Sequence, residues 1–224
     1  MLPDYVGTRS RLLELDILAK HHKKRHPELH VERSPFLDPD FCQERILKNH
    51  KIRGLAFSHG DYLKSRKIAW AGSYISTTNA NYHLGVDVNV PVGTRIALDW
   101  PGRVVLVDND TPEPHGWGNR VIIALEHHPV HLIYAHFSSP FVKTGDQLVG
   151  GTILGTIGSK EENGGWYPHA HVQAVENSVF DKHVVQGLAT LDGYAAVKAN
   201  ETVTQAKQRW EKEYPSPYRF IDLS

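Results

Sequence analysis

The stretch VPVGTRIALDWPGRVVLV, residues 90–107, decides the fold class of this chain. Short runs of Val, Ile and Leu alternate with Gly, Pro and Asp, a pattern typical of short β-strands joined by tight turns. The same texture runs from Tyr74 to about Val175. We therefore predict a mainly β fold with an antiparallel core that resembles a sandwich or a barrel.

A second stretch, FVKTGDQLVGGTILGTIG at residues 141–158, resembles the first. Each stretch gives a strand, a glycine turn, a strand, a second glycine turn and another strand. Their similarity indicates an internal duplication within the core.

Flanking α-helices are predicted on both sides of the β-core. Three segments carry the pattern of a helix: residues 10–24, 38–50 and 199–214. Ser10 is the predicted N-cap of the first helix, and Asp38 or Asp40 that of the second. Pro215 stops the third, because proline cannot continue a helix.

These elements divide the chain into three predicted parts. They are a helical and mixed N-terminal extension at residues 1–75, a β-domain at residues 76–180 and a C-terminal extension with a helix at residues 181–224. Between about residues 51 and 75 the sequence is mixed and aromatic, and no element is assigned there.

Composition restricts the partners and the metal ligands. Lys and Arg number 25, as do Asp and Glu, so the net charge is zero and a nucleic-acid partner is not expected. A lone Cys42 can form neither an internal disulfide nor a cysteine zinc site. With fifteen histidines in the chain, a metal would be held by imidazole and carboxylate.

No apolar run approaches the roughly 20 residues of a membrane span. The N-terminal residues also lack the apolar stretch of a signal peptide. These features favour a cytoplasmic location, with a periplasmic or extracellular location as the alternative if another export route is used. The oligomeric state is left open.

Two histidines lie two positions apart in HAHVQAV, residues 169–175. In a strand, His169, His171 and Gln173 share one face, and the small apolar residues between them share the other. The two imidazoles would then lie roughly 7 Å apart, by twice the strand rise. That spacing lets one histidine bind a metal and the other reach the metal's water. The alternative is a pair of surface histidines on an edge strand.

His83 and Asp87 form an HxxxD pair upstream. On a straight strand they would lie about 13 Å apart, too far for one metal ion. Gly85 is the residue between them that permits a bulge or turn.

His136 lies in IYAHFSSP, where strand alternation places it on the same face as Tyr134. A lone histidine on a half-buried strand is compatible with a structural role as well as a catalytic one. In combination, however, His83, Asp87 and His171 make a His2Asp set with a free fourth position, which is typical of a catalytic zinc centre. His136 and His169 then remain as bases or as donors to a developing oxyanion.

The order HxxxD, then YxH, then HxH, set among PGRV, VKTGDQL and ILGTIG, resembles the lysostaphin-type (LytM-type) zinc metallopeptidases. The resemblance runs from about Tyr82 to Gln173. It implies one zinc ion per chain, held by His83, Asp87 and His171, with His136 and His169 as catalytic residues. It also implies a small antiparallel β-structure with a groove, described in that family as a duplicated hybrid motif.

The same resemblance implies a zinc metalloendopeptidase whose substrate is a peptide or peptidoglycan, cleaved in cross-links or stem peptides and often next to glycine. Two alternatives remain open at this point. One is a non-catalytic module that binds a peptide or glycan. The other is a cytoplasmic zinc amide hydrolase with a substrate other than peptidoglycan, favoured by the unusual loop at residues 159–168.

The substrate-binding residues stay unassigned. Trp117 and Trp166 are candidates for groove walls, with ordinary packing as the alternative, and His115 is a further candidate for the groove. Asn79 and Asn81 are candidates for a side chain that fills the fourth metal position in a latent form.

Overall fold

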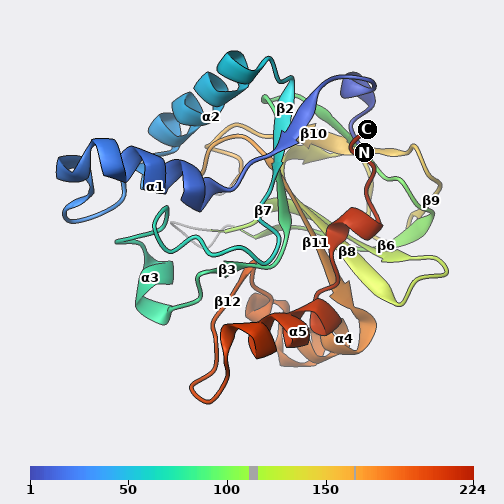
Figure 1. Ribbon diagram of the computed structural model, residues 1–224. Helices are drawn as coiled ribbons and strands as arrows, with labels where there is room; N and C mark the ends of the chain where they lie inside the picture. Colours follow the sequence, from blue (N-terminus) through green and yellow to red (C-terminus); the bar gives the residue numbers. More distant parts are fainter. Residues whose placement is uncertain (111–115, 164) are drawn as a thin grey trace.

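One large β-sheet runs through the centre of the molecule in the computed structural model (Figure 1), which describes residues 1–110, 116–163 and 165–224. The main path of this ten-stranded sheet has the order β1 (Ser10–Leu12), β2 (Phe57–Gly60), β4 (Val86–Asn89), β11 (Ala170–Glu176), β8 (Val130–Pro140), β7 (Gly118–Leu125), β6 (Gly102–Asp110) and β9 (Gln147–Leu148). Off this path, β10 (Ile153–Ile157) pairs with β8 and β5 (Arg95–Ala97). Apart from the parallel pair β1–β2, the pairings are antiparallel, which confirms the mainly antiparallel β-core.

The described strands form an open path with β1 and β9 at its ends, so the sheet does not close into a barrel. A second sheet contains β3 (Tyr82–His83) and β12 (Tyr194–Ala195).

The two similar glycine-containing stretches pair with each other. Strand β5 of the first pairs with β10 of the second, and β6 of the first pairs with β9 of the second. The turns match as well, because Gly93 N donates to Ile157 O at 2.8 Å and Gly145 N donates to Val104 O at 2.9 Å. This reciprocal exchange is the arrangement that an internal duplication predicts.

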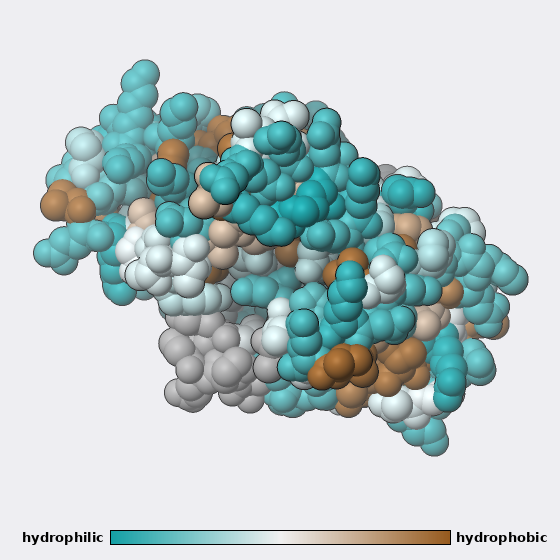
Figure 2. Space-filling view, turned by 90° about the horizontal axis from the view of Figure 1, so that it is seen from below, coloured by the Kyte–Doolittle hydropathy of each residue, from teal (hydrophilic) through white to brown (hydrophobic). Residues whose placement is uncertain are grey.

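Helices flank the sheet on two sides, with α1 and α2 on one side and α4 and α5 on another (Figure 1). The α-helices are α1 (Leu15–Arg25), α2 (Pro39–Arg53), α3 (Tyr74–Thr78), α4 (Asn177–Gln186) and α5 (Val203–Glu213). Short 3-10 turns cover Pro3–Tyr5, Pro27–His30, Pro35–Leu37, Leu188–Thr190 and Pro217–Arg219. No helix among the described residues is long and apolar enough to cross a membrane. The face seen from below is mostly hydrophilic, with scattered apolar side chains (Figure 2).

The predicted N-cap of the first helix is wrong. Ser10 begins strand β1, which pairs with β2, and the helix begins only at Leu15. The Leu15 N–H donates to both carboxylate oxygens of Asp61, at 3.2 and 3.1 Å, so a distant residue provides the cap. The second helix is capped as predicted, because Asp38 accepts a hydrogen bond from Phe41 N.

The central strands bury one face in the main hydrophobic core. Val172 and Ala174 of β11 and Tyr134 of β8 lie in that core, together with the apolar residues of β4. The opposite face of β11 carries His171 and Gln173, as the strand period predicts. This division supplies a rigid support for the polar face.

Candidate metal centre and cleft

Three side chains from three strands meet at one buried point: His83 of β3, Asp87 of β4 and His171 of β11. One ligand atom from each lies within 4.8 Å of the others. His83 Nε2 lies 3.1 Å from His171 Nδ1, and Asp87 Oδ1 lies 3.0 Å from the same nitrogen. Each of the three is at most 4% exposed. The structure therefore places side by side the three residues that the sequence pattern predicted as metal ligands.

Sheet register places these ligands. In the antiparallel pair β4–β11, His171 lies directly opposite Asp87. The β-structure is interrupted between β3 and β4 at Leu84 and Gly85, and His83 Nε2 comes within 3.4 Å of Asp87 Oδ1. Straight-strand spacing would keep the two residues far apart, so the predicted bend is present.

Gly85 is also required for a close approach. A Cβ at this position would lie 2.4 Å from Cε1 and 2.5 Å from Nε2 of His171, and 2.8 Å from Val172 O. These distances are shorter than side chains tolerate, so only glycine leaves the His171 ring in its place.

His171 is oriented by a neighbour on its own strand. Its Nε2 lies 3.3 Å from Gln173 Oε1, while Gln173 Nε2 donates to Asp192 O at 3.2 Å. Because the Gln173 oxygen can only accept, His171 carries its proton on Nε2, and Nδ1 faces Asp87 with its lone pair. Such outer contacts set the tautomer of a metal-binding histidine.

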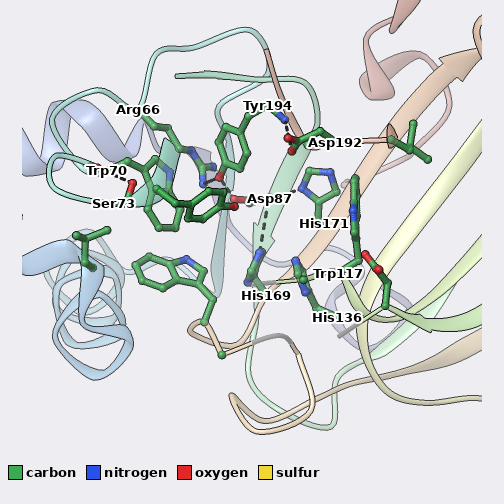
Figure 3. A pocket seen from close by; sticks show the side chains of 18 of the residues that line it. Arg66, Trp70, Ser73, Asp87, Trp117, His136, His169, His171, Asp192 and Tyr194 are labelled. Atoms are coloured by element: carbon green, nitrogen blue, oxygen red, sulfur yellow. Dashed lines mark hydrogen bonds and ion pairs between the residues drawn. The ribbon is translucent and has the colours of Figure 1, made fainter. Parts of the chain in front are cut away.

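His169 and His136 lie beside this cluster, with ring centroids 4.3 Å apart. His169 Nδ1 lies 2.7 Å from Tyr167 O and donates to it, since a carbonyl oxygen only accepts. The unprotonated Nε2 therefore lies toward Asp87, 3.6 Å from Oδ1. Figure 3 shows both imidazoles in the same pocket as Asp87 and His171.

The predicted alternation at His136 is wrong. His136 has φ 73°, in the left-handed region, and the pairing of β7 with β8 shifts register there, with Asn119 opposite Phe137 and Arg120 opposite Ala135. This bulge turns His136 away from the core face on which Tyr134 lies and toward His169. Backbone strain of this kind is concentrated at functional sites.

Burial and a nearby cation set the charges of the site. Burial, then Arg66, holds the pKa of His83 well below its usual range, and burial does the same to the pKa of His136 and lowers that of His169. Burial opposes ionisation of Asp87, but Arg66 and the neighbouring histidines together outweigh burial and keep the pKa of this carboxyl well below its usual range. Neutral imidazoles and an ionised carboxylate are the forms that bind a metal, so the donor set fits one.

A cleft of about 490 Å³ opens over the cluster, within the size range of small-molecule and cofactor sites. Asp87, His136, His169 and His171 line it. Trp70 and Trp166 contact each other in its wall, with ring centroids 4.7 Å apart and planes tilted by 34°, and Trp117 meets His171 edge-on at 5.0 Å. Trp117 and Trp166, the candidates for groove walls, both line this cleft, and neither Asn79 nor Asn81 is among the described lining residues. His115 lies outside the described residues.

Several functional candidates were missed at the sequence level. Arg66, Trp70 and Tyr194 line the cleft, yet they come from segments that carried no metal or catalytic motif. The available signal was weak: Arg66 lies in a mixed, aromatic segment five positions after Asp61.

A cluster of imidazoles and a carboxylate at the floor of an open cleft is typical of proteins with a catalytic metal site. Residues 81–186 match the family model described as Peptidase family M23, and the chain carries a lysostaphin-like domain of that family. Zinc is the metal of this family, and the His83–Asp87–His171 cluster is a group of described residues that could hold such an ion.

The relatives show the extent of the similarity. The chain is 31% identical over 134 residues to lysostaphin of Staphylococcus simulans, a match that spans 59% of this chain and 26% of the relative. It is 33% identical over 139 residues to the glycyl-glycine endopeptidase ALE-1 of Staphylococcus capitis, spanning 62% of this chain and 35% of the relative. The chain thus spans about a third or less of these curated relatives. The solved catalytic domain of the S. simulans antimicrobial peptidase lysostaphin is 30% identical, with a TM-score of 0.38, over 44% of this chain and 71% of that domain.

Proposed function

We propose that this chain is a zinc-dependent endopeptidase that hydrolyses peptide bonds in peptidoglycan cross-links, in stem peptides or in other glycine-containing peptides. The observation that carries the proposal is the His83–Asp87–His171 cluster at the floor of a cleft that His136 and His169 also line. The relatives described as lysostaphin and as a glycyl-glycine endopeptidase support the substrate class.

In this proposal His83, Asp87 and His171 hold the zinc. Bound zinc lowers the pKa of a water molecule and polarises a carbonyl oxygen. His169 presents an unprotonated Nε2 to the cleft, because its Nδ1 donates to Tyr167 O, and so it is the acceptor for the proton of the attacking water. His136, adjacent to His169, donates to the oxyanion that develops on the substrate.

A second candidate function is hydrolysis of an amide outside peptidoglycan. Arg33, Trp70 and Tyr74 line the cleft from before the family-matched segment, and Leu191 and Tyr194 line it from after that segment. The groups that would select a substrate are therefore partly this chain's own. The choice of bond need not follow that of the staphylococcal relatives.

The test is cleavage of purified peptidoglycan and of a set of glycine-containing peptides, with products read by mass spectrometry. Zinc-loaded wild type is compared with His136→Ala and His171→Ala. We expect cleavage only by wild type, with one zinc per chain retained in His136→Ala and lost in His171→Ala. His136→Asn is the matched control for backbone strain, because asparagine tolerates the left-handed backbone at this position.

Full activity in His136→Ala would remove His136 from the mechanism. Wild type that binds one zinc per chain but cleaves neither peptidoglycan nor any peptide would refute the peptidase. Screening of other amides would then test the second candidate.

A further inference from the structure

A fully buried arginine lies beside the proposed metal cluster. Arg66 is 2% exposed, and its guanidinium has a polar partner on each nitrogen. Nη2 donates to Asp87 Oδ2 at 2.5 Å, Nε donates to Asp61 Oδ2 at 3.0 Å, and Nη1 donates to Tyr194 Oη at 3.1 Å. Nη2 also lies 3.4 Å from His83 Nδ1. Figure 3 shows Arg66 reaching Asp87 from the side opposite His171.

The two oxygens of Asp87 therefore have different environments. Oδ1 faces the imidazoles, at 3.0 Å from His171 Nδ1 and 3.4 Å from His83 Nε2. Oδ2 is occupied by the guanidinium of Arg66. Only one oxygen of this carboxylate is free to join the two ligand nitrogens.

We propose that Arg66 is a positioning residue that makes Asp87 a single-oxygen metal ligand, and that Asp61 and Tyr194 hold its guanidinium in place. The proposal rests on the proposed zinc centre. Reserving Oδ2 keeps a second carboxylate oxygen out of the coordination sphere. The fourth position then stays open for water or substrate, as a catalytic zinc site requires.

The charge of Arg66 alone does not account for this arrangement. A cation beside a metal site repels the metal, so attraction of zinc is not its contribution. Arg66 instead balances the charge of two buried carboxylates, Asp61 and Asp87. The fixed orientation of its guanidinium is what directs Asp87 Oδ1 toward the imidazoles. A lysine could supply the same charge but not three donors in fixed directions.

The anchors of Arg66 are themselves well fixed. Asp61 accepts from Leu15 N at the start of α1, so the first helix and the guanidinium share one carboxylate. Tyr194 lies in β12, which pairs with the strand that carries His83. Segments before and after the central strands β4 and β11 therefore determine where the guanidinium lies.

The test compares wild type, Arg66→Lys and Arg66→Gln as full chains. Zinc affinity is measured by competition with a chelator, and the ligand geometry is read from the visible absorption of the cobalt(II)-substituted protein. Loss of an outer contact to a metal ligand weakens metal binding by about 10–100-fold. We expect that loss in both variants, together with weaker cobalt absorption as the second Asp87 oxygen joins the coordination sphere.

A wild-type zinc Kd and cobalt spectrum in Arg66→Lys would overturn the proposal, since charge balance alone would then suffice. The same result in Arg66→Gln would overturn it as well. If Arg66→Gln does not fold, Tyr194→Phe removes one hydroxyl and leaves both carboxylates paired. That variant should weaken zinc binding several-fold and shift the cobalt bands, and an unchanged Kd and spectrum would contradict the proposal.

These measurements separate the inference from the proposed function. A peptidase that cleaves its substrate while Arg66→Lys binds zinc normally would refute only the positioning role. A wild type that cleaves nothing, combined with a weakened Arg66→Lys centre, would refute only the peptidase.

Discussion

Replacing Gly85 by alanine tests whether the metal centre depends on the close approach of His171. The new Cβ would lie 2.4 Å from His171 Cε1, whereas ordinary contact begins at 3.4 Å, so the ring must move by about 1 Å. Zinc–nitrogen distances of about 2.0–2.1 Å tolerate only small shifts. Zinc binding must hold the ring at its original position, against the new methyl group.

The expected rise in the zinc Kd follows from the cost of holding the ring against this methyl group. Overpacking a well-filled site costs about 1–3 kcal/mol. At about 1.4 kcal/mol for each tenfold change in affinity, the zinc Kd of Gly85→Ala should rise by roughly 5–150-fold. The melting temperature of the metal-free Gly85→Ala protein should also fall, because Val172 O at 2.8 Å crowds the new methyl group.

The assay is chelator competition for zinc, with thermal unfolding of the metal-free proteins beside it. Gly193→Ala is the matched control, because its Cβ would meet the same His171 ring at 3.6 Å, an ordinary contact distance. It should bind zinc within about twofold of wild type, since nothing has to move. Equal zinc affinities in wild type, Gly85→Ala and Gly193→Ala would refute the reasoning.

Three further predictions concern stability, the substrate and pH. Trp210→Ala should lower the free energy of unfolding by about 3–5 kcal/mol, because the side chain is 1% exposed in a hydrophobic cluster; Val203→Ala, exposed on the same helix, is the control, and similar losses in both would contradict this. Trp166→Ala should raise KM more than it lowers kcat and leave zinc affinity unchanged, because Trp166 lines the cleft away from the ligands; a loss confined to kcat would count against a wall role. Burial lowers the pKa of His131, so below about pH 6.5 the unfolded chain takes up this proton more readily than the folded chain, and the free energy of unfolding decreases as the pH is lowered. His131→Gln should flatten that pH dependence in denaturant titrations at pH 5 to 7. An unchanged pH dependence would exclude His131 as a source.

Local periodicity accounts for what the sequence predicted well. His171 and Gln173 share a face because β11 is a regular strand, and its period is a local property. His169 directly precedes this strand and lines the same cleft as His171. The same reasoning failed at His136, because its orientation depends on a bulge formed with β7, a partner strand that periodicity within β8 does not report. The combination of residues found the site even where alternation misplaced one of its members.

Long-range pairing accounts for what the sequence did not predict. The start of α1 depends on the carboxylate of Asp61, which is distant in the chain, so a rule based on neighbouring residues chose Ser10. Arg66 is buried because Asp61, Asp87 and Tyr194 receive it. Of those partners only Asp87 is marked by its spacing from a histidine, and an arginine is expected at the surface unless it is paired.

The contacts of Arg66 also bear on where a catalytic unit ends. The family-matched segment covers residues 81–186, whereas Asp61 and Arg66 precede it and Tyr194 follows it. A protein trimmed to the limits of homology would keep His83, Asp87 and His171 but would leave Asp87 Oδ2 without its guanidinium. Inactivity of such a fragment would therefore reflect the loss of the contact that positions Asp87, and not the loss of a metal ligand. In this chain, the segment that is recognisable across relatives is smaller than the segment that must be present for its ligands to stand in the right place.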